Sequence, residues 1–437
     1  MNQDGIGNLA LSEHELSGTS FDIFSAPERN DSVITGKEVE IRLFTTLDSS
    51  GPFEFNIPST DEYTLLPLTR LHGTSQIVNK DGVPVVDDID FSVANLFPQT
   101  IFSQMDLEIG GTNLSCQDNL YMYKSYLETL LSYGYDAKVS ALSTSHFIKD
   151  TAHNFENGRE GNDGYTKRSK IVSGGKIFDW SIIPHVDFFH TPRVLPPNVG
   201  MKLKLTRALD GFSIISKEHT DLCVKIHSLN LYVYRLQPTD AIRRAHDKMF
   251  LKQNALFPIT RSLCKKYTIP SGLSTAHQPN IVNGGLPRQI VIGFVKAAAL
   301  NGSYALNPFN FNHFDCSFIA LRVNGQQVPA KGFRPDFRKG LVSRELRNLY
   351  DNIGINAPGD DNGCNIDMND FTGGYTLFCF DLTPDRCSGF HLHDIRNGTI
   401  DLEIVFNKPL QEAITIICYT AFENVIAITN ERNVLIG

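Results

Sequence analysis

Short stretches in which every second residue is apolar recur along the whole chain. In residues 398–410, GTIDLEIVFNKPL, the apolar positions run from Ile400 to Phe406 with acidic residues between them, and residues 200–211, GMKLKLTRALDG, show the same alternation with lysines. A period of two is expected of a β-strand with one buried and one solvated face. The pattern therefore predicts a chain built mainly of strands.

Two runs are apolar almost without interruption. They are residues 288–298, RQIVIGFVKAA, and residues 413–428, AITIICYTAFENVIAI. A continuous apolar run of this kind is typical of a strand that is covered on both faces of its sheet. We therefore expect both segments to be buried on both sides.

The order of elements repeats after about two hundred residues. Each half has, in order, a strand running into a tight turn, a helix-like stretch that ends at a glycine, a polar loop rich in Gly and Asn, and an aromatic strand. These elements are residues 106–114, 119–134, 153–170 and 176–189 in the first half, and 320–328, 337–354, 356–374 and 375–385 in the second. Solenoid repeats are only about 20–50 residues long, so this period indicates a duplicated domain.

The spacing and length of the halves support the same interpretation. Phe178 precedes Leu203 by the interval that separates Leu377 from Leu402. Single cores rarely grow beyond about 250–300 residues, so a chain of 437 residues is expected to divide. We predict four regions: an acidic N-terminal arm, a first domain, a short helical linker and a second domain, at residues 1–30, 31–236, 237–258 and 259–437.

Runs of strands without alternating helices determine the predicted fold class. They exclude a doubly wound α/β plan and leave a sandwich or a barrel. Among sandwiches, the jelly roll accommodates long loops at one end, because its two sheets form a core that does not depend on them. We therefore predict an all-β protein made of two tandem eight-stranded antiparallel jelly rolls with short inserted helices.

Composition and charge argue against several classes of function. The formal net charge is −8, and the first thirty residues are themselves acidic, which argues against a surface that binds nucleic acid through Lys and Arg. No apolar run approaches the roughly 20 residues that span a bilayer, and the first residues lack the pattern of a signal peptide. The eight cysteines form no C-x-x-C pair and are expected to be buried free thiols.

Several long stretches resemble one known family. Residues 286–329, 373–385 and 399–434 are similar to the second half of the double jelly-roll major capsid protein of Polinton (Maverick) elements and the related adintoviruses, and the similarity extends upstream through residues 126–138 and 195–208. It covers roughly residues 35–437. Long matched stretches are a more specific signal than one short motif.

The resemblance implies a structural protein with no catalytic residue, metal ligand or cofactor. It implies a homotrimer that forms a pseudo-hexameric capsomer, contacts neighbouring capsomers and penton or minor capsid proteins, and encloses double-stranded DNA without sequence-specific contact. No small-molecule substrate is expected. The implied location is the virion, after synthesis in the host cytoplasm without a signal peptide and assembly in the cytoplasm or nucleus.

Two alternatives belong to other classes. One is a two-domain, lectin-like sandwich that binds glycans through residues 157–170 and the corresponding loop at 356–374, because exposed loops on sandwiches often carry binding sites. The other is a bicupin oxygenase with a metal bound by His391 and His393, followed by Asp394. Cupins add a Glu four or five residues after the second His, where this chain has Asn397 and Gly398, so a metal is not expected there.

Two further groups of residues carry side chains that could act chemically. His185 and His190 flank the sequence VDFF near two prolines, and no Ser or Cys lies in a nucleophile-elbow context, so we interpret them as loop residues rather than a catalytic pair. Basic residues surround the linker and either face packaged DNA or form a solvated helix paired with acidic groups, the second being preferred for an acidic chain: Arg243, Arg244, Lys248, Lys252, Arg261, Lys265 and Lys266.

Overall fold

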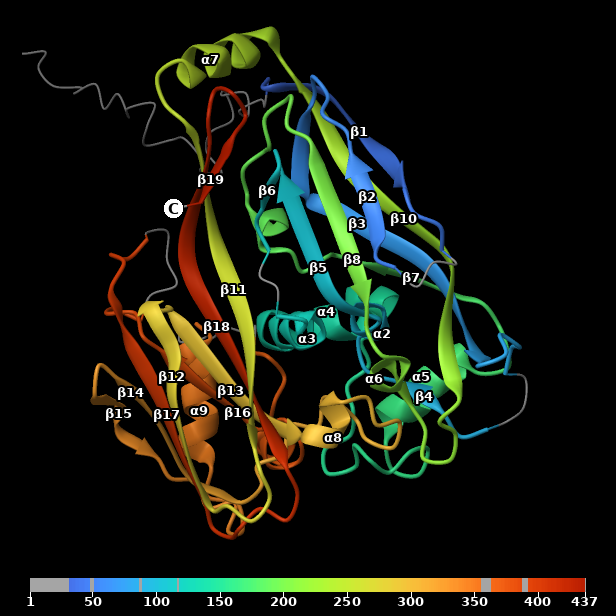
Figure 1. Ribbon diagram of the computed structural model, residues 1–437, viewed down its shortest axis with the longest axis vertical. Helices are drawn as coiled ribbons and strands as arrows, with labels where there is room; N and C mark the ends of the chain where they lie inside the picture. The colour runs from blue at the N-terminus through green and yellow to red at the C-terminus, as the bar shows by residue number, and fades with distance from the viewer. Residues whose placement is uncertain are drawn as a thin grey trace, which may run out of the picture.

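The chain folds into two β-sandwiches that stand side by side, as the computed structural model shows (Figure 1). The structure describes residues 31–47, 51–85, 89–115, 118–354, 363–386 and 392–436, so the predicted N-terminal arm lies outside the described residues. Each half contains two antiparallel sheets of four main strands. The predicted class, an all-β protein of two jelly rolls, is confirmed.

The first half pairs its strands in the orders β1-β10-β3-β7 and β2-β8-β5-β6. Their bounds are β1 Val33–Arg42, β2 Phe53–Ile57, β3 Tyr63–Asn79, β5 Phe102–Ile109, β6 Thr112–Asn113, β7 Phe178–Ile182, β8 Met201–Arg207 and β10 Leu222–Pro238. A separate short pair is formed by β4, Ser92–Val93, and β9, Ile214–Ile215.

The second half has the orders β11-β18-β13-β16 and β12-β17-β14-β15. Its strands are β11 Ala255–Ile269, β12 Thr275–Gly285, β13 Gln289–Lys296, β14 Cys316–Val323, β15 Gln326–Phe333, β16 Leu377–Asp381, β17 Asn397–Phe406 and β18 Ile414–Ile428, and β19, Val434–Ile436, adds to β18. When the eight main strands of each half are numbered along the chain, both halves have the sheet orders 1-8-3-6 and 2-7-4-5. The duplication predicted from the sequence is thus a duplication of topology.

The two matched hairpins turn in the same way. Residues 110–111 connect β5 to β6, and residues 324–325 connect β14 to β15. All four turn residues have positive φ, with Gly111 at 83° and Gly325 at 82°. Positive φ at both central positions defines the type I′ turn, which suits the twist of paired strands and favours Asn-Gly and Gly-Gly.

The two continuously apolar runs become central strands, which are buried on both faces along β13 and the first half of β18, whereas residues 422–425 and 427 of β18 are partly exposed. Every residue of β13 between its two ends is buried, and so are the first eight residues of β18. One face packs on the second sheet of the same half. The other face meets helices, including α3, Tyr121–Ser132, which follows the first-half hairpin along the chain but lies against β11 and β18 of the second half (Figure 1).

Helices occupy the connections between strands. They are α2 Phe97–Thr100, α4 Tyr135–Val139, α5 Asp163–Val172, α6 Asp210–Ser213, α7 Asp240–Phe250, α8 Ala297–Leu300, α9 Ser343–Asn352 and α10 Met368–Thr372, with 3-10 helices η1 Ala141–Ser145 and η2 Asp187–His190. The predicted helices at 119–134 and 337–354 correspond to α3 and α9. No helix in the described part of the chain has the length and apolar character needed to cross a membrane.

The polar segments predicted as loops are partly helical, so that prediction was wrong for α5 and α10. The Asn162 side chain accepts a hydrogen bond from the backbone N–H of Tyr165, which caps α5. Asp367 and Asp370 form a reciprocal capping box around the start of α10. Asn and Asp were interpreted as loop formers, whereas here they begin helices.

The linker contains α7, and Thr239 occupies its N-cap position without a capping bond from its side chain. Strand β10 runs to Pro238 and β11 begins at Ala255, so strand pairing extends into the predicted linker range from both sides. In Figure 1, α7 stands at one end of the molecule, beyond the sheets of both halves.

The single tryptophan of the chain lies in the core of the first half. Trp180 on β7 is only 1% exposed and pairs across the sheet with Gly73 on β3. A Cβ on Gly73 would lie 2.4 Å from the indole ring, so only glycine leaves room for it. The indole N–H donates to Ser75 Oγ over 2.9 Å.

Candidate functional site

The contact between the two halves contains two groups of interacting polar side chains. We call this contact the joint, and the two groups its closed and open sectors. The closed sector is built around Asp150 and Arg168 on one side and Asn307 and Tyr375 on the other. The open sector consists of Asp118, Lys124, Glu128, His185, Asp187 and His190 of the first half with Ser262, Cys264 and Tyr419 of the second. Six of these residues line a cleft: Glu128, His185, Asp187, His190, Ser262 and Tyr419. Asp118 and Lys124 line a smaller pocket that shares His185, Asp187 and Ser262 with the cleft.

An aromatic cluster lies within the joint. Tyr126 of α3 stacks on Phe309 with ring centroids 3.9 Å apart and an interplanar angle of 4°. Tyr123 meets Phe309 and Phe311 edge to face. All four residues belong to the same buried cluster as the second-half core, so α3 fills the core of the half to which it does not belong in sequence.

The closed sector is a buried ion pair whose polar atoms are well supplied with partners. Arg168 and Asp150 have side chains that are 0% exposed, and Arg168 Nη2 lies 2.6 Å from Asp150 Oδ1. The guanidinium also donates to the backbone carbonyls of Val93 and Ile148. A buried charge pair is tolerated only when further hydrogen bonds replace the lost water, and this one has them.

Asp150 also reaches across the joint. Its Oδ2 accepts from Asn307 Nδ2 over 3.2 Å, while its backbone carbonyl accepts from the Tyr375 hydroxyl over 2.7 Å. Its Oδ1 additionally accepts from Asn162 Nδ2. One residue thus connects the first-half ion pair to two segments of the second half, through its carboxylate and its backbone carbonyl.

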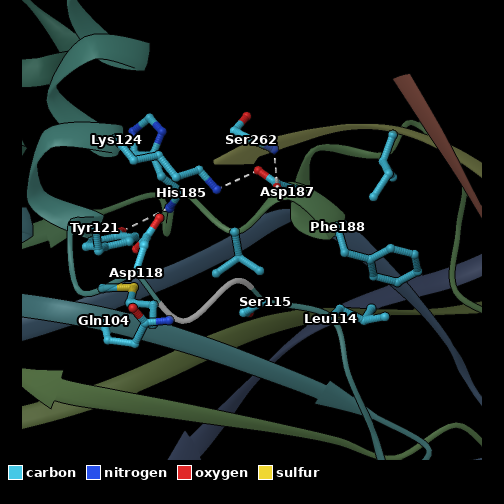
Figure 2. Close-up of a pocket in the computed structure, with 13 residues that line it drawn as sticks. Gln104, Leu114, Ser115, Asp118, Tyr121, Lys124, His185, Asp187, Phe188 and Ser262 are labelled. Atoms are coloured by element: carbon cyan, nitrogen blue, oxygen red, sulfur yellow. Dashed lines mark hydrogen bonds and ion pairs between the residues drawn. The ribbon is translucent and has the colours of Figure 1, made fainter. Parts of the chain in front are cut away.

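In the open sector, carboxylates of the first half cap the outer edge of β11, and Figure 2 shows Asp187 beside Ser262. Asp187 Oδ2 accepts from the backbone N–H of Ser262 over 2.9 Å, and Asp118 Oδ2 accepts from that of Cys264 over 3.1 Å. β11 is the edge strand of its sheet, and unpaired edge N–H groups invite pairing with another strand. The carboxylates occupy these donors without extending the sheet.

Lys124 balances the negative charge of these carboxylates. Its Nζ lies 2.5 Å from Asp187 Oδ1. Burial lowers the pKa of Lys124, but the carboxylates of Asp187 and Glu128 more than offset this, so its pKa is raised and the ammonium stays charged.

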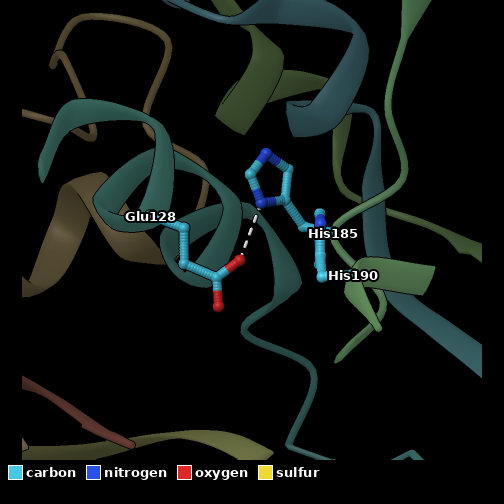
Figure 3. Close-up of side chains that lie close together, drawn as sticks. All are labelled: Glu128, His185 and His190. Atoms are coloured by element: carbon cyan, nitrogen blue, oxygen red, sulfur yellow. Dashed lines mark hydrogen bonds and ion pairs between the residues drawn. The ribbon is translucent and has the colours of Figure 1, made fainter. Parts of the chain in front are cut away.

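Glu128, His185 and His190 come together at the wall of the cleft (Figure 3). Glu128 projects from α3, His185 lies between β7 and η2, and His190 ends η2. Glu128 Oε2 is 2.7 Å from His185 Nδ1. One ligand-type atom from each of the three residues lies within 4.8 Å of the others.

Second partners orient this trio. The Tyr419 hydroxyl, from β18 of the second half, lies 3.1 Å from Glu128 Oε1, and Thr129 Oγ1 lies 3.1 Å from His185 Nε2. Burial raises the pKa of Glu128, but Lys124 and His185 outweigh it and lower that pKa to about 2. Because an ionised carboxylate only accepts hydrogen bonds, His185 Nδ1 carries the proton between them.

His190 differs from its neighbours by its exposure to the cleft. Its side chain is exposed, whereas His185 is buried. Although one side of the ring is exposed, the residues packed around it desolvate the ring, and together with the neighbouring His185 they lower the pKa of His190. The cleft has a volume of about 740 Å³ and is lined by both halves, including Arg288 and Tyr419.

His185 and His190 come together with a residue that no local pattern in the sequence links to them. His185 and His190 do lie in a connection between strands, but they meet Glu128, which the sequence analysis did not consider. Glu128 and His185 are 57 residues apart, and no local pattern links them. The trio could be found only once α3 was known to pack beside η2.

Of the cupin-type residues, His393 and Asp394 lie just before β17. His391 lies outside the described residues, and residues 392–396 precede β17, which starts at Asn397. His393 Nε2 lies 2.8 Å from Asp385, and its Nδ1 lies 3.1 Å from Glu423. Hydrogen bonds to these two carboxylates raise the pKa of His393, and Asp394 is exposed.

The basic residues around the linker are divided between two elements. Arg243, Arg244 and Lys248 lie on α7, and Lys252 follows it, while the other three lie on β11. Arg243 donates to the backbone carbonyl of Asp61, and Lys265 donates to that of Ile281. These two contacts are made to carbonyl groups rather than to the acidic side chains that the sequence analysis favoured.

The two polar loops contact each other across the joint. The backbone N–H of His153 donates to the carbonyl of Gly373 over 2.7 Å. Glu156 accepts from the side chain of Asn310 over 3.1 Å, and Lys149 lies 2.5 Å from Asp370. On the second-half side, Asp370 and Gly373 belong to the loop at 356–374 of the glycan-binding alternative, whereas the first-half residues precede its other segment, residues 157–170.

Comparisons with known proteins agree with this architecture. No protein-family model matches the chain. An uncharacterized protein of Caenorhabditis elegans, F54H12.2, is 23% identical over 410 residues, which is 91% of this chain and 96% of that protein.

Solved structures match over almost the full length. The PBCV-1 virus capsid model has a TM-score of 0.60 at 12% identity, covering 95% of this chain and 99% of that one. The Sputnik virophage structure gives 0.61 at 12% identity, covering 96% and 91%, and the mavirus major capsid protein gives 0.56 at 11%, covering 96% and 93%. The chain has the double jelly-roll fold seen in these viral capsid structures.

Proposed function

We propose that this protein is a major capsid protein. The observation that carries the proposal is the pair of sandwiches with identical strand order, in a fold shared over 95% of the chain with the PBCV-1 virus capsid model. Its role is structural, with no catalytic site. The division into an arm at 1–30, rolls at 31–236 and 259–437 and a linker at 237–258 is part of this proposal.

A trimer explains why one chain should contain the same roll twice. Three chains present six similar rolls, so an assembly with closed threefold symmetry acquires a nearly hexagonal outline. Such an outline tiles a shell through contacts with neighbouring capsomers, while penton and minor capsid proteins complete it. Many modest contacts supply the total binding energy.

The shell would enclose double-stranded DNA without reading its sequence. An acidic chain offers little general affinity for phosphate, so contacts with DNA are expected to be few and salt-dependent. The proposed location is the virion, with synthesis in the host cytoplasm and assembly there or in the nucleus.

Within this class, we assign the chain to the Polinton (Maverick) and adintovirus type. The residues quoted above carry the resemblance, and the relative in a nematode supports a capsid gene that resides in animal genomes. Sequencing the DNA around this gene tests the assignment: an integrated element with defined ends supports it, and a free viral genome contradicts it.

Light scattering on the purified protein tests the trimer directly. The expected species has the mass of three chains, and co-expression with the partner capsid proteins should give spherical particles with hexagonally arrayed capsomers in electron micrographs. A protein that stays monomeric at every concentration and forms no particle with its partners would contradict the proposal.

A further inference from the structure

We propose that Glu128, His185 and His190 bind a divalent transition-metal ion, with Zn²⁺ as the best fit, at the wall of the cleft between the two halves (Figure 3). The inference is independent of the capsid role, because it rests on the chemistry of this cluster alone. Two imidazoles and one carboxylate are a common protein ligand set for Zn²⁺ that leaves a coordination position for water.

The geometry needs only a small adjustment. Zn²⁺ binds imidazole nitrogen and carboxylate oxygen at about 2.0–2.2 Å, which places neighbouring ligand atoms about 3.3 Å apart in a tetrahedral site. Glu128 Oε2 and His185 Nδ1 are 2.7 Å apart, so they would separate slightly to admit the ion. His190 has to move closer, which its exposed side chain allows.

The ion would take the place of the proton at His185 Nδ1. His185 Nδ1–H now donates to Glu128, and metal binding at Nδ1 requires the neutral ring to carry its one proton on Nε2 instead, with no net loss of a proton. The ring then keeps its hydrogen on Nε2, where Thr129 Oγ1 lies 3.1 Å away and can accept it. A ligating histidine typically makes such a hydrogen bond through its other nitrogen.

The surrounding charges favour a cation. Lys124 is matched by Asp187 at 2.5 Å, so among the charged groups next to the imidazoles Glu128 and the nearby Asp118 supply the negative charge, while Arg288 lies elsewhere on the cleft wall. Tyr419 holds the second oxygen of Glu128 from the opposite half, which fixes the orientation of the carboxylate. The cleft of about 740 Å³ gives the ion a path from solvent and room for a bound water.

Binding would connect three segments of the joint. Glu128 lies on α3, the two histidines lie around η2, and Tyr419 belongs to β18. A ligand that binds only the folded state stabilises it by mass action. Metal occupancy should therefore strengthen the contact between the two halves.

The test uses the full-length protein freed of metal by a chelator, then dialysed against Zn²⁺ and passed over a gel-filtration column. One Zn²⁺ per chain by elemental analysis is the expected result, with a rise in thermal midpoint. His190→Ala should bind at least about 100-fold more weakly, since loss of a second-shell partner alone costs about 10–100-fold. Because His190 is exposed, this variant should keep the fold, which circular dichroism checks.

His277→Ala is the matched control, because His277 is an exposed imidazole on β12, and it should bind Zn²⁺ like the wild type. Tyr419→Phe should weaken binding about tenfold by releasing Glu128. Wild-type protein that leaves the column with far less than one Zn²⁺ per chain would overturn the proposal. So would a His190→Ala protein that binds as tightly as the wild type.

Discussion

The closed and open sectors of the joint each contain an ion pair that contacts the second half, but the two pairs differ in their exposure to solvent. Each sets a cation of the first half beside a carboxylate that also reaches the second half. In the closed sector, Arg168 and Asp150 are both 0% exposed, whereas in the open sector the Lys124 and Asp187 side chains are 12% and 16% exposed. The enclosed pair has no access to solvent and acts only as a structural contact. The groups that line the cleft, including Asp187, are accessible to protons and ions.

The largest expected effect breaks the closed sector. Asp150→Asn leaves the Arg168 charge buried without its counter-charge, and breaking a buried pair on one side costs about 3–5 kcal/mol. Urea unfolding followed by far-UV circular dichroism measures the loss. A loss below about 1 kcal/mol would show that the pair contributes no more than a surface pair.

In the open sector, the pH dependence of stability should depend on Glu128. Its pKa is lowered from 4.5 to about 2 in the folded protein, so the folded state binds fewer protons than the unfolded state in that range. The contribution is complete above about pH 4.5 and is lost as pH falls towards 2. At 1.36 kcal/mol per pKa unit it amounts to about 3 kcal/mol.

Glu128→Gln removes that contribution. The difference in unfolding free energy between wild type and variant should therefore shrink between pH 4.5 and pH 2, when both are measured in the presence of a chelator. A difference that stays constant across this range would show that the environment of Glu128 does not lower its pKa.

A smaller effect is expected from the hydroxyl that crosses the open sector. Tyr419→Phe removes the contacts with Glu128 and Ser262 Oγ. Hydrogen bonds to charged groups contribute about 1.5–3 kcal/mol, and those between neutral groups less, so we expect a loss of about 2 kcal/mol without metal. If the variant is as stable as the wild type, water has replaced the hydroxyl and this part of the joint is wetter than described.

A surface pair gives the lower reference for both sectors. Arg322 and Glu403 form a cross-strand ion pair on the second half, and their side chains are 41% and 27% exposed. Exposed pairs contribute about 0–1 kcal/mol, so Glu403→Gln should change stability by less than 1 kcal/mol in the same urea experiment. A larger loss would mean that surface pairs matter as much as the joint.

The strands and hairpins could be predicted because their signals are local. The turns at 110–111 and 324–325 and the alternation in 398–410 each depend on residues within a few positions of one another. The joint could not be predicted in this way. Asp150 and Asn307 are 157 residues apart, and the apolar stripe of α3 looks like that of any amphipathic helix until the sheet that it covers is known.

The candidate metal site could not be predicted from local signals either. His185 and His190 are visible in the sequence as a pair, yet the third member lies on a helix whose position depends on tertiary packing. The helix α5 was missed for a different reason, because Asn162 and Asp163 are equally good loop and N-cap residues.

The indole of Trp180, which packs against Gly73, gives the first half a fluorescence signal of its own. Since Trp180 is the only tryptophan of the chain, its intrinsic fluorescence reports on one roll while the other contributes no such emission. Coincident transitions in emission and in far-UV ellipticity would show that both rolls melt as one cooperative unit. Emission that changes at a lower or higher urea concentration would show that one roll can open while its twin stays folded.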